Sequence, residues 1–156
     1  MSQVPVDWVA DGHVARAGGT DRPLTEVAVG VLLKANGKFL MTSRPAGKAY
    51  AGYWEFPGGK VEPQESLEQA VTRELYEELG IQVLHCQAWR VQVVDYPHAL
   101  VRLHFFKVLD WSGGLVMREG QHAQWQDLPV QLEPVLPGAL PVLAWLADEQ
   151  GSGQAR

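Results

Sequence analysis

Apolar and polar positions follow two kinds of pattern along the chain, one typical of strands and one typical of helices. Residues 26–33 (EVAVGVLL) are β-branched and apolar, which predicts a buried strand. The dipeptide Asn36-Gly37 is typical of a tight turn, so residues 38–43 (KFLMTS) are expected to form its hairpin partner. Further extended segments are expected at residues 54–56, 82–94, 101–109 and 123–126. The pattern therefore places strands on both sides of one strongly charged segment.

That charged segment carries the boundary signals of a helix. Ser66 can cap its first turn, and Gln69, three residues later, completes a capping box. Gly80 is a typical C-terminal stop, because glycine adopts the left-handed conformation that ends many helices. A helix is therefore expected between Ser66 and Gly80.

The same helix has an apolar stripe that also takes up part of its charge. The apolar positions recur at helical spacing and are Leu67, Ala70, Val71 and Leu75. At about 100° per residue, Glu74 and Glu78 fall within or beside this stripe, and Glu77 falls at its edge. These glutamates are therefore expected to face the body of the protein.

A second helix is expected at residues 137–147, with Pro141 near its first turn. Strands, a helix, more strands and a final helix predict an α/β fold of the α+β kind, with helices packed on the faces of a mixed sheet. Residues 25–148 are expected to form a single domain. Residues 1–24, rich in small and turn-forming types, are expected to be a loosely ordered arm, and residues 149–156 a flexible tail.

Composition narrows the classes of function. The chain has 156 residues and a formal net charge of −5, which disfavours binding to a nucleic-acid polymer or an acidic membrane. No segment has the roughly 20 apolar residues that span a bilayer, and the N-terminus lacks the pattern of a secretory signal. The expected location is the cytoplasm. A single cysteine, Cys86, excludes an intrachain disulfide.

Three glutamates at helical spacing bring negative charges close together on one helix. Glu74, Glu77 and Glu78 repel one another on a bare helix, so a bound cation would relieve them. Carboxylates are hard oxygen donors suited to Mg²⁺ or Mn²⁺, and such an ion bridges an acidic site to a phosphate ester. The glycine pair Gly58-Gly59 before the helix lets backbone approach a ligand closely. The alternative is a solvated helix face with no ligand.

The spacing of these residues resembles a known family. Gly59, Glu65, Arg73-Glu74-Leu75, Glu77-Glu78 and Gly80-Ile81 match the defined positions of the Nudix box. The segments SRPAGKAYAGYWEFPGGK and REGQ are similar to the MutT branch of that family. The resemblance implies an α/β/α sandwich with the box helix on one face and the C-terminal helix on another. It also implies a phosphoanhydride hydrolase that converts a nucleoside triphosphate to the monophosphate and pyrophosphate.

The resemblance also implies roles for individual residues. The implied metal ligands are the Gly59 carbonyl, Glu74, Glu77, Glu78 and Glu119, with Mg²⁺ or Mn²⁺ as the cofactor. Catalytic roles fall on Glu74, Glu77, Glu119 and Arg73; either Glu74 or Glu119 activates water, and Glu65 and Arg73 support the site.

Residues outside the metal set are expected to contact substrate. Arg44 and Lys60 are placed to contact phosphates, and the alternative for each is an ordinary surface charge. Phe56 is placed to contact the base. MutT-type proteins read the purine with an asparagine, and Ala139 stands at that position here. Alanine makes no amide contact, which weakens the assignment to a particular base.

The implied substrate is 8-oxo-dGTP, with CTP or a modified pyrimidine triphosphate as the competitor. Two further functions are compatible with the same scaffold: a nucleotide-binding regulator without catalysis, and a hydrolase of nucleotide sugars or dinucleotides. Retention of all box glutamates favours an enzyme over the regulator. The sequence indicates no oligomeric state.

Overall fold

The computed structural model describes residues 6–10 and 22–154, with side chains described for residues 22–151. The strands are β1 (Val6–Ala10), β2 (Leu24–Leu32), β3 (Phe39–Ser43), β4 (Trp54–Glu55), β5 (Gly58–Lys60), β6 (Gln82–Asp95), β7 (Leu100–Ser112) and β8 (Ala123–Gln126). The helices are α1 (Leu67–Leu79) and α2 (Leu140–Gln154), and a 3-10 turn, Pro137–Ala139, immediately precedes α2.

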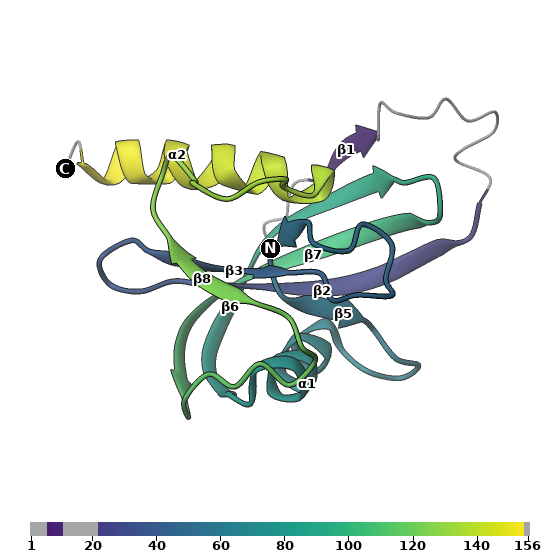
Figure 1. Ribbon diagram of the computed structural model, residues 1–156, viewed down its shortest axis with the longest axis horizontal. Coiled ribbons are helices and arrows are strands. Elements are labelled where there is room, and N and C mark those ends of the chain that lie inside the picture. The colour runs from purple at the N-terminus through teal and green to yellow at the C-terminus, as the bar shows by residue number, and fades with distance from the viewer. Residues whose placement is uncertain (1–5, 11–21, 155–156) are drawn as a thin grey trace.

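Two sheets form the centre of the described structure. The larger one has five strands in the order β1-β6-β7-β2-β5, and the smaller one has the order β4-β3-β8. The larger sheet is mixed, because β2 runs parallel to β7 and antiparallel to β5. Figure 1 shows α1 and α2 on opposite sides of the strands. The mixed sheet with a helix on each side confirms the predicted fold class.

Strand β2 contributes to two cores because its side chains alternate between the two faces of the sheet. Ala28 and Leu32 pack in the core that contains the buried face of α1, whereas Val29 and Val31 pack in the core that contains α2. Gly30 lies on the same face of β2 as Ala28 and Leu32, and a Cβ there would be 2.8 Å from Leu75 Cδ1. The lack of a side chain at Gly30 therefore allows β2 to pack closely against Leu75 of α1.

The ends of α1 are formed as the sequence predicts. Ser66 Oγ accepts a hydrogen bond from the Gln69 amide at 3.0 Å, and Gln69 Oε1 accepts one from the Ser66 amide at 2.8 Å. Gly80 has φ 72°, and its N–H donates to the carbonyl of Tyr76. The capping box and the glycine stop are both confirmed.

The predicted hairpin between residues 26–33 and 38–43 is wrong in its pairing. Only a single bridge, Leu33 to Phe39, joins the two segments, and β3 pairs instead with β4 and β8. The edge of β2 that the hairpin would use lies opposite β7, and β5 pairs with part of it, at Val27–Val29. Strand β3 enters the second sheet, where all five of its residues are buried.

The two chain ends also contain more regular structure than expected. Residues 6–10, expected to lie in a loose arm, form β1 parallel to β6, whose free edge offers unpaired N–H and C=O groups. The rest of that arm, residues 1–5 and 11–21, lies outside the described residues. Helix α2 continues to Gln154 rather than ending near residue 147, and Gln150 Nε2 donates to the Gly37 carbonyl at 3.2 Å.

None of the helices in the described part of the chain has the length and apolar character needed to span a membrane.

We expect Ser66→Ala to lower the free energy of unfolding by about 1 kcal/mol, because it leaves an amide of the first turn of α1 without its acceptor. Chemical denaturation followed by circular dichroism measures this change. Ser112→Ala, at the exposed end of β7, is the matched control and should have little effect. Equal stability of the two variants would contradict a role for the cap.

Candidate active site

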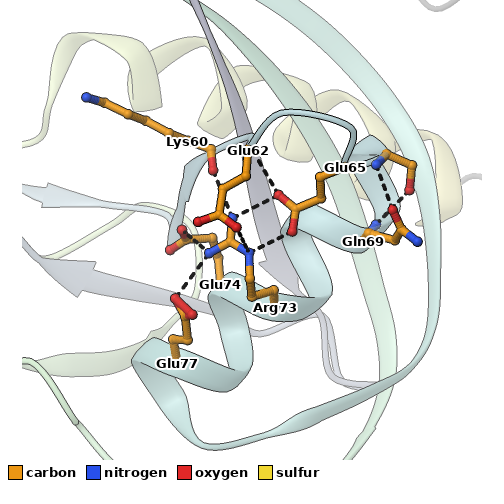
Figure 2. Close-up of polar contacts among 8 residues, drawn as sticks. Lys60, Glu62, Glu65, Gln69, Arg73, Glu74 and Glu77 are labelled. Carbon is orange, nitrogen blue, oxygen red and sulfur yellow. Dashed lines mark hydrogen bonds and ion pairs between the residues drawn. The ribbon is translucent and has the colours of Figure 1, made fainter.

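The guanidinium of Arg73 is the centre of a polar network at the start of α1 (Figure 2). Its Nε donates to Glu65 Oε2 at 2.7 Å, and its Nη2 donates to Glu65 Oε1 at 2.9 Å. Glu65 lies in the loop before the helix, so this two-point pairing holds the loop against α1. The hydrogen bonds from Arg73 lower the pKa of Glu65 to about 2, with further help from the Glu62 amide.

The same guanidinium also reaches the helix glutamates and strand β5. Its Nη1 donates to Glu74 Oε1 at 2.9 Å and to Glu77 Oε1 at 3.1 Å, and its Nη2 donates to the Lys60 carbonyl at 3.0 Å. Figure 2 shows these groups arranged around one side chain. Hydrogen bonding to Glu65 raises the pKa of Arg73, so it remains a cation. Arg73 therefore positions two of the predicted metal ligands at once.

The glycine pair lets these groups pack against bare backbone. A Cβ on Gly59 would lie 2.3 Å from Glu74 Cδ, and a Cβ on Gly58 would lie 2.2 Å from the Ala28 carbonyl oxygen. Neither position accepts a side chain without a rearrangement. The Glu74 carboxylate consequently lies directly over the backbone of β5, next to the predicted Gly59 ligand.

Glu78 has one carboxylate oxygen that is shut off from solvent. This atom, Oε2, has no hydrogen-bond partner among the described residues. Burial raises the pKa of Glu78 to about 9, together with the negative charges of Glu74, Glu119 and Glu55 in that order of importance. A buried carboxylate with an unpaired oxygen, surrounded by other carboxylates, is a donor set that suits a hard divalent cation.

These donors are not already arranged as a metal site. Among the residues whose side chains are described, no three His, Cys, Asp or Glu groups converge on one point. Glu77 instead contacts Arg73 and is 53% exposed. The donor chemistry therefore fits a divalent cation, and binding one would require the carboxylates to draw together.

Glu119 is brought to this region by hydrogen bonds between its loop and the end of α1. The amide of Arg118 donates to the Glu78 carbonyl at 3.1 Å, and Gln121 Nε2 donates to the same oxygen at 3.1 Å. Gln121 Oε1 also accepts from the Glu119 amide at 2.9 Å. Gln121 is buried and was not singled out from the sequence, although it ends the REGQ segment.

A cavity of about 680 Å³ joins this region to an apolar one. Its charged lining residues, here called the charged end, include Arg44, Glu55, Lys60, Glu74, Glu77, Glu78 and Glu119, and four of these carboxylates interact electrostatically. Its apolar lining residues, here called the apolar end, include Val27, Tyr50, Tyr96, Val101, Leu103, Leu136, Gly138 and Ala139, most of which pack in one cluster. Every side chain predicted to bind metal or substrate, together with Gly59, lines this one cavity, whereas Arg73 and Glu65 support it from outside.

The predicted substrate-binding residues differ in how accessible they are. Arg44 lies at the charged end, where its Nη1 pairs with Glu55 Oε1 at 3.2 Å and its Nε donates to the Ala49 carbonyl. Lys60 is exposed. Phe56 is only 4% exposed and packs against Phe39, so most of its ring belongs to the core.

Sequence reasoning did not find two features of the cavity. The first is Glu55, whose pKa is raised by burial although Arg44 opposes this shift. The second is a group of rings, in which Tyr50 lies 5.6 Å from Tyr96 and 5.8 Å from His98 between centroids. Tyr50 has φ 60°, an unusual conformation for a non-glycine residue, and no local sequence signal indicated it.

The chain is similar to known proteins over most of its length. The NUDIX domain matches residues 24–146. The 8-oxo-dGTP diphosphatase of Proteus vulgaris is 37% identical over 100 residues, covering 64% of this chain and 89% of that protein. The CTP pyrophosphohydrolase of Escherichia coli K12 is 38% identical over 116 residues, covering 74% of this chain and 86% of that protein.

A solved structure from a study of MutT from Aliivibrio salmonicida and Vibrio cholerae superimposes with a TM-score of 0.66 at 32% identity. It covers 81% of this chain and 99% of its own. The residues that the NUDIX domain matches include β2 to β8, α1 with its glutamates and the first half of α2. On the box spacing, the fold and these matches, the chain belongs to the Nudix family.

Proposed function

We propose that this protein is a magnesium-dependent nucleoside triphosphate pyrophosphohydrolase of the MutT type. The observation that carries the proposal is the cavity itself, which has carboxylates and basic groups at one end and apolar and aromatic groups at the other. A nucleoside triphosphate has the matching division between a polyphosphate tail and a base. In the proposed reaction, water attacks the β-phosphorus, and the products are a nucleoside monophosphate and pyrophosphate.

Nudix hydrolases generally use a divalent cation. We propose that here the ion is Mg²⁺ or Mn²⁺, held by the Gly59 carbonyl, Glu74, Glu77, Glu78 and Glu119. The unpaired Glu78 Oε2 and the oxygen-only donor set support this assignment. When bound, the ion would supply positive charge that offsets the phosphate oxygens and the surrounding carboxylates.

The chain's own groups orient the reactants. Arg73 orients Glu74 by donating to its Oε1, and Glu74 and Glu119 are the two residues proposed to accept the proton of the attacking water. Arg44 and Lys60 line the charged end and are proposed to contact the phosphates. Glu65 positions Arg73 and does not itself line the cavity.

Two substrates follow from different observations. Four relatives named 8-oxo-dGTP diphosphatase match at 34% to 37% identity over 100 residues or more, which supports 8-oxo-dGTP as the substrate. Ala139 lines the apolar end with a methyl group where the MutT branch has a purine-reading amide. That substitution favours CTP or a modified pyrimidine triphosphate as the second candidate, and one relative is named for CTP.

The test of the proposed function is a comparison of 8-oxo-dGTP, dGTP, dCTP and CTP under one set of conditions with Mg²⁺. We expect release of pyrophosphate and the nucleoside monophosphate, abolished by a chelator, with the highest kcat/KM for 8-oxo-dGTP. A highest value for CTP would support the second candidate. If none of the four is hydrolysed, the proposed activity is wrong, and a nucleotide-binding regulator becomes the better description.

We expect Glu77→Gln to lower turnover by at least about a hundredfold, because it removes a charge that holds the cation. Stability should change little, since Glu77 is half exposed and its pairing with Arg73 is of a weak, solvent-screened kind. Steady-state kinetics and thermal unfolding measure the two effects. The matched control is Glu68→Gln, an exposed glutamate of α1 that does not line the cavity. Near-normal turnover of the Glu77 variant would count against the metal set.

We expect Ala139→Asn to raise the ratio of kcat/KM for 8-oxo-dGTP over dGTP, because the amide would add a donor and an acceptor at the apolar end of the cavity. The same steady-state assay measures that ratio. An unchanged ratio in a variant that remains folded would mean that residue 139 does not meet the base.

A further inference from the structure

The 3-10 turn Pro137–Ala139 is held through both backbone polar groups of one residue, Gly138. The Gly138 amide donates to the Tyr96 hydroxyl at 3.0 Å, and the Gly138 carbonyl accepts from Gln92 Nε2 at 2.8 Å. Gln92 lies in β6 and Tyr96 follows directly after that strand. The two bonds therefore attach the turn to the end of the larger sheet.

This arrangement depends on glycine at position 138. A Cβ there would lie 2.8 Å from the Tyr96 hydroxyl oxygen and 3.1 Å from Leu103 Cδ1. A larger residue would force the turn away from the sheet. Burial raises the pKa of Tyr96, so its hydroxyl stays protonated and the cavity gains no negative charge there.

Burying the Gln92 side chain has a cost in folding stability, although this side chain holds the turn. Its side chain is 0% exposed, and its Oε1 has no hydrogen-bond partner among the described residues. A buried, unsatisfied amide oxygen destabilises a fold, because it has lost its hydrogen bonds to water and has gained none in return. Such groups in native cores are uncommon and require an explanation beyond packing.

The backbone of the turn has no amide left to contact a ligand. The Gly138 amide is bound to Tyr96, the Ala139 amide donates to the Leu136 carbonyl at 2.9 Å, and the Leu140 amide donates to the Pro137 carbonyl. Proline at 137 has no N–H. Backbone donors near Gly138 therefore do not replace the missing asparagine, and the turn contributes a wall of fixed position.

We propose that Gln92 and Tyr96 are positioning residues that preorganise this turn as the wall of the base-binding end of the cavity. The inference rests on the proposed function, because it assigns the base to the end lined by Tyr96, Gly138 and Ala139. A wall fixed in advance lowers the entropy lost on binding, whereas a loose wall must be ordered by the ligand. Recognition of the base then depends on the shape of the cavity more than on hydrogen bonds from the turn.

The test uses Gln92→Met, which keeps the side-chain volume and removes the bond to Gly138. Binding of a non-hydrolysable deoxynucleoside triphosphate analogue and of inorganic tripolyphosphate is measured by calorimetry with Mg²⁺. We expect the nucleotide to bind roughly fivefold to tenfold more weakly, the equivalent of about one buried hydrogen bond, and tripolyphosphate to bind with unchanged affinity. The melting temperature should change little, because the variant also removes the unpaired Oε1.

Gln126→Met is the matched control. Gln126 is also a buried glutamine, and its Oε1 accepts from the Gln131 amide at 3.0 Å, but it lies in β8 and does not line the cavity. This variant should leave the ratio of the two affinities unchanged. If Gln92→Met leaves that ratio unchanged as well, or weakens both ligands equally, the positioning role is wrong.

A double-mutant cycle with Tyr96→Phe adds a second readout. The two side chains hold the same residue, Gly138, so their effects on nucleotide affinity should be non-additive, while additive effects would overturn the shared role. Turnover is scored separately from binding. If the protein hydrolyses none of the nucleotides but Gln92→Met weakens nucleotide binding alone, the proposed activity is rejected and the positioning role is supported. If the protein hydrolyses nucleotides but Gln92→Met leaves the ratio of the two affinities unchanged, the activity is supported and the positioning role is rejected.

Discussion

The concentration of negative charge between β5 and α1 is the constraint on which the site depends. Glu65, Glu74 and Glu77 all contact the single guanidinium of Arg73, and Glu78 lies buried beside Glu74 and Glu119. One arginine does not neutralise so many carboxylates, and Glu78 has an unpaired oxygen. The folded chain thus has a site where positive charge is needed, and this need is the physical link between its fold and phosphate chemistry.

The larger sheet places this charge next to an apolar surface. Gly58 and Gly59 of β5 pair with Val29 and Ala28 of β2, which pairs in parallel with β7 on its other edge. Because β2 lies between β5 and β7, the carboxylates of α1 and the apolar residues near Tyr96 open into the same cavity. Helix α2 lies on the side of the strands opposite α1 (Figure 1), and the turn before α2 forms part of the cavity wall. The cavity therefore requires elements from nearly the whole length of the domain.

Local signals in the sequence were sufficient for α1 and its charged face. Ser66, Gln69 and Gly80 act within a few residues of their own positions, so their capping roles are determined by adjacent backbone. The spacing of Glu74, Glu77 and Glu78 likewise places them on the helix in a way that depends only on its periodicity. The same is true of β6, β7 and β8, whose apolar patterns extend over most of each strand.

The sequence by itself thus determined α1, most strands and the residues that carry the Nudix box. These features depend on residues that are close together in the sequence. Tertiary structure alone decided that β3 leaves β2 for a second sheet, since this choice depends on which distant strands pair with one another. It also decided that Gln92 and Tyr96 meet Gly138, more than 40 residues away. No local pattern encodes such contacts, because they arise only when distant segments compete for the same hydrogen-bonding groups and the same space.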